Sequence, residues 1–90
     1  MSYRTKYIHL SGSGSVAGGE CWVAGMYVNS TSSGTVKVYD YTSASGTIVN
    51  NTITPAIGYH NLGNVHCLTG CYIATTGTID VTFHVIEKNN

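Results

Sequence analysis

The stretch that decides the fold is TGTIDVTFHVIE, residues 76–87. After Gly77, a turn residue, apolar and mixed side chains alternate with the period of two that places successive side chains on opposite faces of a β-strand. The stretch therefore predicts a strand with a buried inner face and an outer face that suits a second chain or a covering loop. The inner face would carry Val81, Phe83 and Val85, and the outer face Thr82, His84 and Ile86.

The rest of the chain repeats this strand–turn pattern. Apolar residues are not spaced at helical intervals over three turns anywhere, whereas β-branched and aromatic residues are interrupted by Gly, Ser and Asn at short intervals. The SSG at 32–34 and Gly77 predict turns between separate strands, and Pro55 predicts a strand end because proline cannot donate to the ladder. The sequence therefore predicts an all-β fold, a single antiparallel β-sandwich or jelly roll of seven to eight short strands. The predicted strands include residues at about 3–10, 21–30, 35–43, 47–54, 64–67, 71–76 and 78–87.

Length and composition favour a single domain that associates with other protein. Residues 15–90 are predicted as the β-sandwich domain, and residues 1–14 as an N-terminal segment that could form an arm. A domain of this size buries only about 60–65% of its unfolded surface, so its own core is marginal and oligomerisation is favoured. Charged residues make up only 9% of the chain, and the formal net charge is zero.

The same composition argues against several partners. No basic patch is visible, so we expect no nucleic-acid binding. The apolar runs are too short to span a bilayer, and the first residues lack the apolar core of a signal peptide, so we expect no membrane partner and no export by the standard route.

The cysteine and histidine residues are the candidate metal ligands and nucleophiles of this sequence. Cys67 and Cys71 flank LTG and would face each other in a hairpin, where either a disulfide or, in a reducing cytosol, two free thiols would be consistent with the sequence. Zinc needs four converging ligands, but His66 and Cys67 are adjacent and would leave opposite faces of a strand. Asp40 and Asp80 are expected to satisfy turns or backbone amides. We therefore expect no metal, no cofactor, no catalytic residue and no enzymatic activity.

The second half of the chain resembles a family of small β-sandwich structural proteins encoded by tailed bacteriophages. The resemblance rests on TVKVYDYTSASGTIV (35–49) and TPAIGYHNLGNVHCLTGCYIATTGTIDVTFHVIE (54–87), and it covers about residues 20–87. It implies a capsid decoration (cement) protein or a head–tail or tail accessory subunit. The implied partner is the major capsid protein or another virion protein, the implied form is a homo-oligomer with a trimer favoured, and the implied location is the virion, assembled in the host cytoplasm.

The aromatic residues are candidates for a binding surface, because Tyr and Trp combine a large contact area with a polar group. We expect Trp22 and Tyr27 in the core. Tyr39 and Tyr41, beside Lys37 on one face of their strand, are expected to form a partly exposed interface stripe. A small carbohydrate-binding, lectin-like module is the alternative from another class, since it would stack exposed rings on sugars. The interface candidates are Tyr3, Arg4, Lys6, Tyr7, Lys37, Tyr39, Tyr41 and His84.

Overall fold

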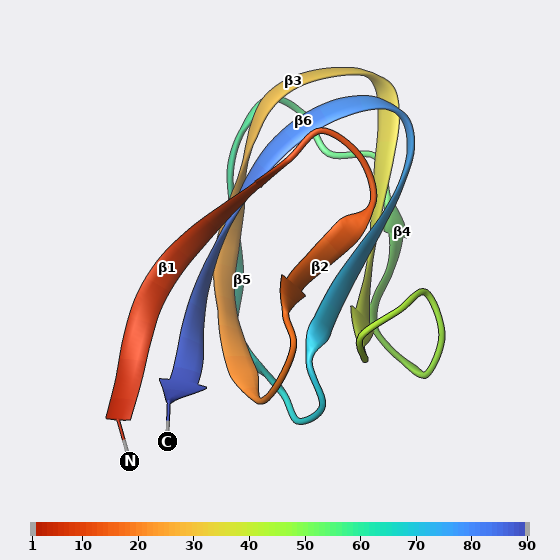
Figure 1. Cartoon of the computed structure of the whole chain (residues 1–90). Coiled ribbons are helices and arrows are strands. Elements are labelled where there is room, and N and C mark those ends of the chain that lie inside the picture. Colours follow the sequence, from red (N-terminus) through yellow and green to blue (C-terminus); the bar gives the residue numbers. More distant parts are fainter. Residues whose placement is uncertain (1, 90) are drawn as a thin grey trace.

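The computed structural model describes residues 2–89, with the side chains of residues 2–88. These residues form six strands of one antiparallel sheet and contain no helix, so none of them belongs to a helix that could cross a membrane (Figure 1). The path through the sheet is β1-β6-β3-β4, with β2 paired to β6 and β5 paired to β3. The strands are β1 (Ser2–Leu10), β2 (Gly14–Ala17), β3 (Cys21–Asp40), β4 (Thr47–Ile53), β5 (Gly58–Cys67) and β6 (Cys71–Asn89).

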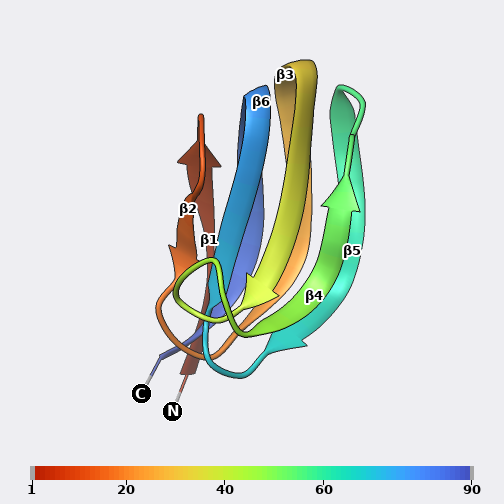
Figure 2. The same ribbon diagram turned by 90° about the vertical axis from the view of Figure 1, so that its right-hand side faces the viewer.

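Two long strands fold this sheet back on itself. β3 has 20 residues and β6 has 19, and both curve over the same end of the molecule (Figure 1). On one side of the bend β1, β6, β3 and β5 lie next to one another, and on the other side β2, β6, β3 and β4 do (Figure 2). We call these the first and second halves of the sheet, and they enclose the core between them.

The bend depends on residues that carry little or no side chain. Ser33 and Gly77 have φ values of 57° and 70°, a left-handed backbone that glycine adopts most easily. β3 and β6 stay paired on both sides of the bend, from Ser32 with Thr78 to Thr35 with Thr76. A Cβ atom at Gly77 would lie 2.6 Å from the Ser33 carbonyl oxygen, so only glycine permits this close approach.

The prediction of an all-β antiparallel fold is confirmed, but the predicted strand count is wrong. The segments 32–34 and Gly77 are bends inside continuous strands and not turns between separate ones, because the partner strand follows the same bend. Six strands therefore stand, in the described chain, where seven to eight short ones were predicted. The arrangement is one folded sheet, and a sandwich or jelly roll of separate strands is not confirmed.

The inner face predicted for residues 81–85 is confirmed. Val81, Phe83 and Val85 are completely buried, and they pack with apolar side chains from both halves of the sheet. Phe83 is the largest side chain in this core. Its other buried members are Val16, Ala17, Cys21, Val23, Met26, Val28, Val36, Val38, Cys67, Cys71, Ile73 and Ile79.

The N-terminal segment lies in the sheet. β1 pairs with β6 along its whole length, from Ser2 opposite Asn89 to Leu10 opposite Val81. The strand predicted at about 3–10 is thus present, and residues 2–10 are held by the ladder rather than extended away from it. β2 then begins at Gly14, so residues 2–13 of the expected N-terminal segment contain one strand and the connection that follows it.

Candidate functional site

The outer face of the first half carries most of the exposed aromatic side chains of the described chain. Its rings come from four strands, and we call this surface the aromatic face. Tyr7 is 74% exposed, Tyr59 50% and Tyr27 46%, so these rings are available to a partner. The members of the aromatic face are Tyr3, Tyr7, Trp22, Tyr27, Tyr59, His66 and His84.

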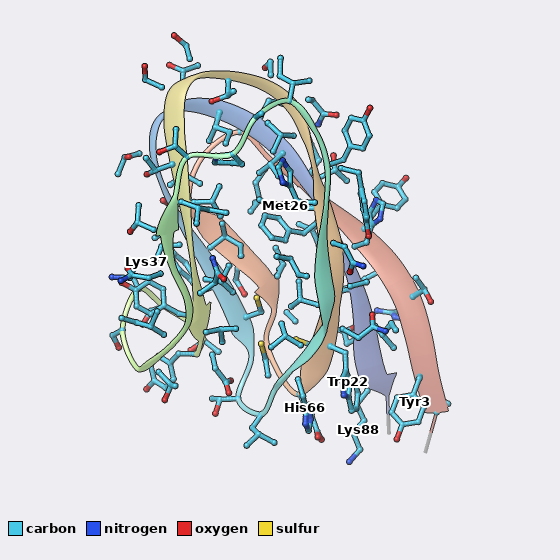
Figure 3. All side chains as sticks on the ribbon, turned by 180° about the vertical axis from the view of Figure 1, so that it is seen from behind. Tyr3, Trp22, Met26, Lys37, His66 and Lys88 are labelled. Carbon is cyan, nitrogen blue, oxygen red and sulfur yellow. The ribbon has the colours of Figure 1, made fainter. Side chains whose placement is uncertain are left out.

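One ring cluster joins β1, β3 and β5 near the chain ends. The Trp22 ring stacks on His66, with ring centroids 4.5 Å apart and planes 5° apart. Tyr3 meets Trp22 edge to face, at a centroid distance of 5.4 Å and an angle of 71°. Figure 3 shows these three side chains at one end of the molecule, beside Lys88. Stacked and edge-to-face pairs of this kind hold their rings in fixed positions.

The Glu20 carboxylate holds the outer edge of this cluster through two contacts. Glu20 Oε2 lies 2.6 Å from His66 Nε2, and Glu20 Oε1 lies 3.1 Å from Lys88 Nζ. The pKa of Glu20 is lowered, first by its hydrogen bond with His66 and then by that with Lys88. The backbone N–H of Lys88 also donates to the Glu20 carbonyl oxygen at 3.2 Å. The loop before β3 is thereby tied to the end of β6, beneath Trp22.

A second ring cluster lies one step along the same strands. Tyr7 stands opposite His84 in the pairing of β1 with β6, and Tyr59 approaches His84 from β5 with centroids 5.9 Å apart. Tyr59 lies over Gly25, where a Cβ atom would come within 2.2 Å of the Tyr59 hydroxyl oxygen. Gly25 therefore makes room for a ring that crosses β3 to reach β6.

Beyond this cluster the face becomes polar. Asp80 Oδ2 lies 2.8 Å from His9 Nε2, and the Asn29 side-chain amide donates to Asp80 Oδ1 at 2.8 Å and to the Thr82 hydroxyl at 3.2 Å. The pKa of Asp80 is lowered, first by its bond with His9 and then by that with Asn29. Because both oxygens have partners, this carboxylate serves the surface network.

The aromatic face is broad and only shallowly hollowed. One hollow of about 300 Å³ is lined by Tyr3, Trp22, Asn64 and Ile86. A second, of about 370 Å³, lies against Tyr7 and His84. The first is almost entirely apolar in its lining, which suits a flat apolar or aromatic group more than a charged one.

The structure separates the interface candidates instead of bringing them together. Tyr3, Tyr7 and His84 lie on the aromatic face. Lys37 and Tyr39 lie on the outer face of the second half, where the Lys37 ammonium sits 5.2 Å from the centre of the Tyr39 ring. Figure 3 shows Lys37 far from Tyr3 and Trp22.

The other three candidates contribute no ring to the clusters of the aromatic face, although Lys6 lines its second hollow. Tyr41 follows the end of β3 and packs against Gly46 in the next loop. Arg4 and Lys6 both reach Glu87, at 3.2 Å and 2.8 Å, and lower its pKa, with the Lys6 contribution the larger. These two cations therefore fasten β1 to β6, and the single Glu87 carboxylate offsets one of their two charges.

The aromatic face also holds four residues that are not among the interface candidates predicted from the sequence, namely Trp22, Tyr27, Tyr59 and His66. Trp22 and Tyr27 were expected in the core, but both point outward, and Tyr27 is well exposed. The sequence indicates the outward position of Trp22 in part, because Trp22 stands between Cys21 and Val23, whose side chains are fully buried on the other face of the strand. The pattern breaks at the register shift between Val23 and Gly25, so the apolar run looks continuous.

The part of the chain that is described contains no cluster of side chains suited to a metal ion. Within residues 2–89, no three His, Cys, Asp or Glu side chains are arranged to hold a metal ion. Asp40 accepts hydrogen bonds from the backbone N–H groups of Leu68 and Thr69, at 3.0 Å and 2.8 Å. Burial raises the pKa of Asp40, but these backbone donors outweigh it and leave the pKa lowered.

No family model matches the chain, and neither the curated proteins nor the solved structures include one that is significantly similar to it.

Proposed function

We propose that this protein is a structural subunit that binds other protein chains through the aromatic face. We further propose that its assembly is the virion of a tailed phage, where it would act as a capsid decoration protein on the major capsid protein. The observation that carries the first proposal is the aromatic face itself. The resemblance in residues 20–87 is what supports the phage setting.

Three properties of the aromatic face favour a protein partner. Tyr and Trp are the residues most enriched among the energetic anchors of protein interfaces. The surface spans four strands, whereas small-molecule sites are clefts that bury most of the ligand. A hollow elsewhere, lined by Val38, Val49 and Leu62 among others, holds only about 90 Å³. The acidic groups around the aromatic face are already paired with His or Lys, so a partner need not supply charge.

Self-association is the simplest form of this binding, because a 90-residue domain has a marginal core of its own. A second copy that covers the aromatic face would add apolar burial that the single chain lacks. A homotrimer is the proposed form, as expected for a subunit that sits on a threefold position of a capsid.

Carbohydrate binding is the second candidate, and the hollow between Tyr3 and Trp22 favours it. The Asn64 side chain lies at the same hollow and could bond sugar hydroxyls. The stacking of His66 on Trp22 weakens this candidate, since one face of the indole ring is then covered.

The test compares Tyr7→Ala on the aromatic face with Tyr41→Ala as a matched control in the second half. Light scattering after size exclusion, at micromolar concentration, should report an oligomer for the wild type and for Tyr41→Ala. Loss of an anchor ring costs about 1–2 kcal/mol per interface, so Tyr7→Ala should weaken assembly roughly 5- to 30-fold. A monomeric wild type, or equal effects of both variants, would count against self-association by this face.

The virion assignment needs a separate measurement. Quantitative mass spectrometry of purified particles should find the protein in hundreds of copies if it decorates the capsid. A small copy number per particle, in a low multiple of three, six or twelve, would instead indicate the head–tail or tail accessory role. Absence from the particle, combined with ring-dependent binding on a glycan array, would replace the proposal with the carbohydrate-binding candidate.

A further inference from the structure

Three thiols meet in the core at the end of the molecule opposite the bend. Cys21 begins β3, Cys67 ends β5 and Cys71 begins β6. All three are free and completely buried. The Cys67 thiol hydrogen-bonds with both of the others. None of the three belongs to the aromatic face, so they form a chemical feature separate from the proposed binding surface.

The strand register selects one pair among the three. Cys21 lies directly opposite Cys67 in the pairing of β3 with β5. Residues directly opposite in antiparallel strands have Cβ atoms about 4.5–5.5 Å apart, close to the roughly 3.5–4.5 Å found across a disulfide. Cys71 instead lies opposite Ala17 in the pairing of β2 with β6.

This register corrects the arrangement considered from the sequence. Cys67 and Cys71 were expected to face each other if LTG closed a hairpin. In the described sheet β5 pairs with β3 and not with β6, so residues 68–70 cross from one half of the sheet to the other. Cys71, the next cysteine along the chain, is therefore not the residue that lies opposite Cys67 in the sheet.

We propose that Cys21 and Cys67 are a thiol–disulfide site, which a low-molecular-weight disulfide such as glutathione disulfide oxidises to a bond locking β3 to β5. In the first step the Cys67 thiolate attacks one sulfur of glutathione disulfide and releases one glutathione thiolate. The Cys21 sulfur then loses its proton, attacks the Cys67 sulfur and releases the second glutathione. Two protein thiols are oxidised, one glutathione disulfide is reduced to two glutathione thiols, and Cys71 remains a thiol.

Cys67 is the attacking group because its two neighbours stabilise its thiolate. Hydrogen bonds from Cys21 and Cys71 lower the pKa of Cys67, while the bond with Cys67 and burial raise the pKa of Cys21 and of Cys71. The lowered pKa thus identifies Cys67 as the attacking thiol, and the strand register identifies Cys21 as its partner.

Access to the buried thiols runs through residues 68–70. Leu68 is 67% exposed, and the loop is held by the two backbone hydrogen bonds that Asp40 accepts from Leu68 and Thr69. Opening so short a segment is a local event that leaves the core strands paired. Asp40→Asn weakens these bonds and also removes a nearby carboxylate charge that raises the pKa of the Cys67 thiol. Both changes act in the same direction, so the substitution should speed oxidation about fivefold.

The test maps the disulfide formed by the native protein. The protein is incubated with glutathione disulfide, the remaining thiols are alkylated, and chymotrypsin is used because it cleaves after Leu68 and so separates Cys67 from Cys71. Non-reducing mass spectrometry should find a peptide that links Cys21 to Cys67, and an alkylated Cys71. A bond to Cys71, a lasting glutathione adduct, or thiols that stay unreacted while the urea-unfolded chain oxidises would each overturn the proposal.

Matched variants keep the result interpretable. Cys71→Ser should still lose two hydrogens on oxidation, whereas Cys67→Ser, which retains Cys21 and Cys71, should not form an internal bond. Circular dichroism checks that each variant is folded, and Cys71→Ala replaces Cys71→Ser if the hydroxyl is not tolerated in the core. Because Cys71 also helps to lower the pKa of Cys67, its variants should form the bond more slowly than the wild type. A folded Cys71 variant that forms no Cys21–Cys67 bond even on prolonged incubation would overturn the proposed pair.

Discussion

Gly77→Ala tests the bend on which the folded sheet depends. Gly77 has φ of 70°, and a Cβ atom there would lie 2.6 Å from the Ser33 carbonyl oxygen and 3.2 Å from the Gly34 Cα. All of these neighbours are backbone atoms, so they cannot rotate away as a flexible side chain would. The substitution should therefore force β3 and β6 apart where both strands bend.

Gly63→Ala supplies the matched control for this substitution. Gly63 also has φ of 70°, but no atom lies within 4 Å of the position that its Cβ would take. The left-handed backbone alone costs a residue with a side chain roughly 1–2 kcal/mol. The clash at Gly77 adds about 1–3 kcal/mol, the usual cost of overpacking. We thus expect a loss of about 2–5 kcal/mol for Gly77→Ala and about 1–2 kcal/mol for Gly63→Ala.

Urea unfolding, followed by circular dichroism and by the fluorescence of Trp22, measures both variants. Each kcal/mol corresponds to roughly 4–8 °C in the melting temperature of a domain of this size, so a thermal scan should separate them clearly. If Gly77→Ala loses no more stability than Gly63→Ala, the close approach of the two bent strands is refuted. The chain would then be better described by the separate strands and turns that the sequence predicted.

Two further predictions concern the core and the carboxylates. Phe83→Ala should cost about 3–5 kcal/mol in urea unfolding, because Phe83 is completely buried and leaves a cavity; a loss below 1 kcal/mol would place it outside the core. The carboxyl groups of Glu20, Asp40, Asp80 and Glu87 all have lowered pKa values in the folded chain, so their contribution to stability is present above their unfolded pKa values, near 3.8 and 4.5. That contribution is lost as the pH falls through the folded values, so the urea midpoint should drop only below about pH 4.5. A midpoint that stays constant to pH 2 would contradict these bonds.

What could be predicted from the sequence is what depends on immediate neighbours along the chain. The alternation in residues 81–86 identified the buried face of β6 correctly, because side chains of any strand alternate between its two faces. The absence of helical spacing likewise predicted an all-β fold, and the described residues form one.

What only the tertiary structure decided depends on the partner strand. A glycine such as Gly77 can turn a chain into a hairpin or bend a strand that stays paired, and the choice is made by whether β3 bends at the same point. The outward position of Tyr27 and the pairing of Cys21 with Cys67 follow from the register among β3, β5 and β6, including its shift after Val23. A shift of one residue moves every following side chain to the other face, so these features are properties of the assembled sheet and could not be found in any single segment.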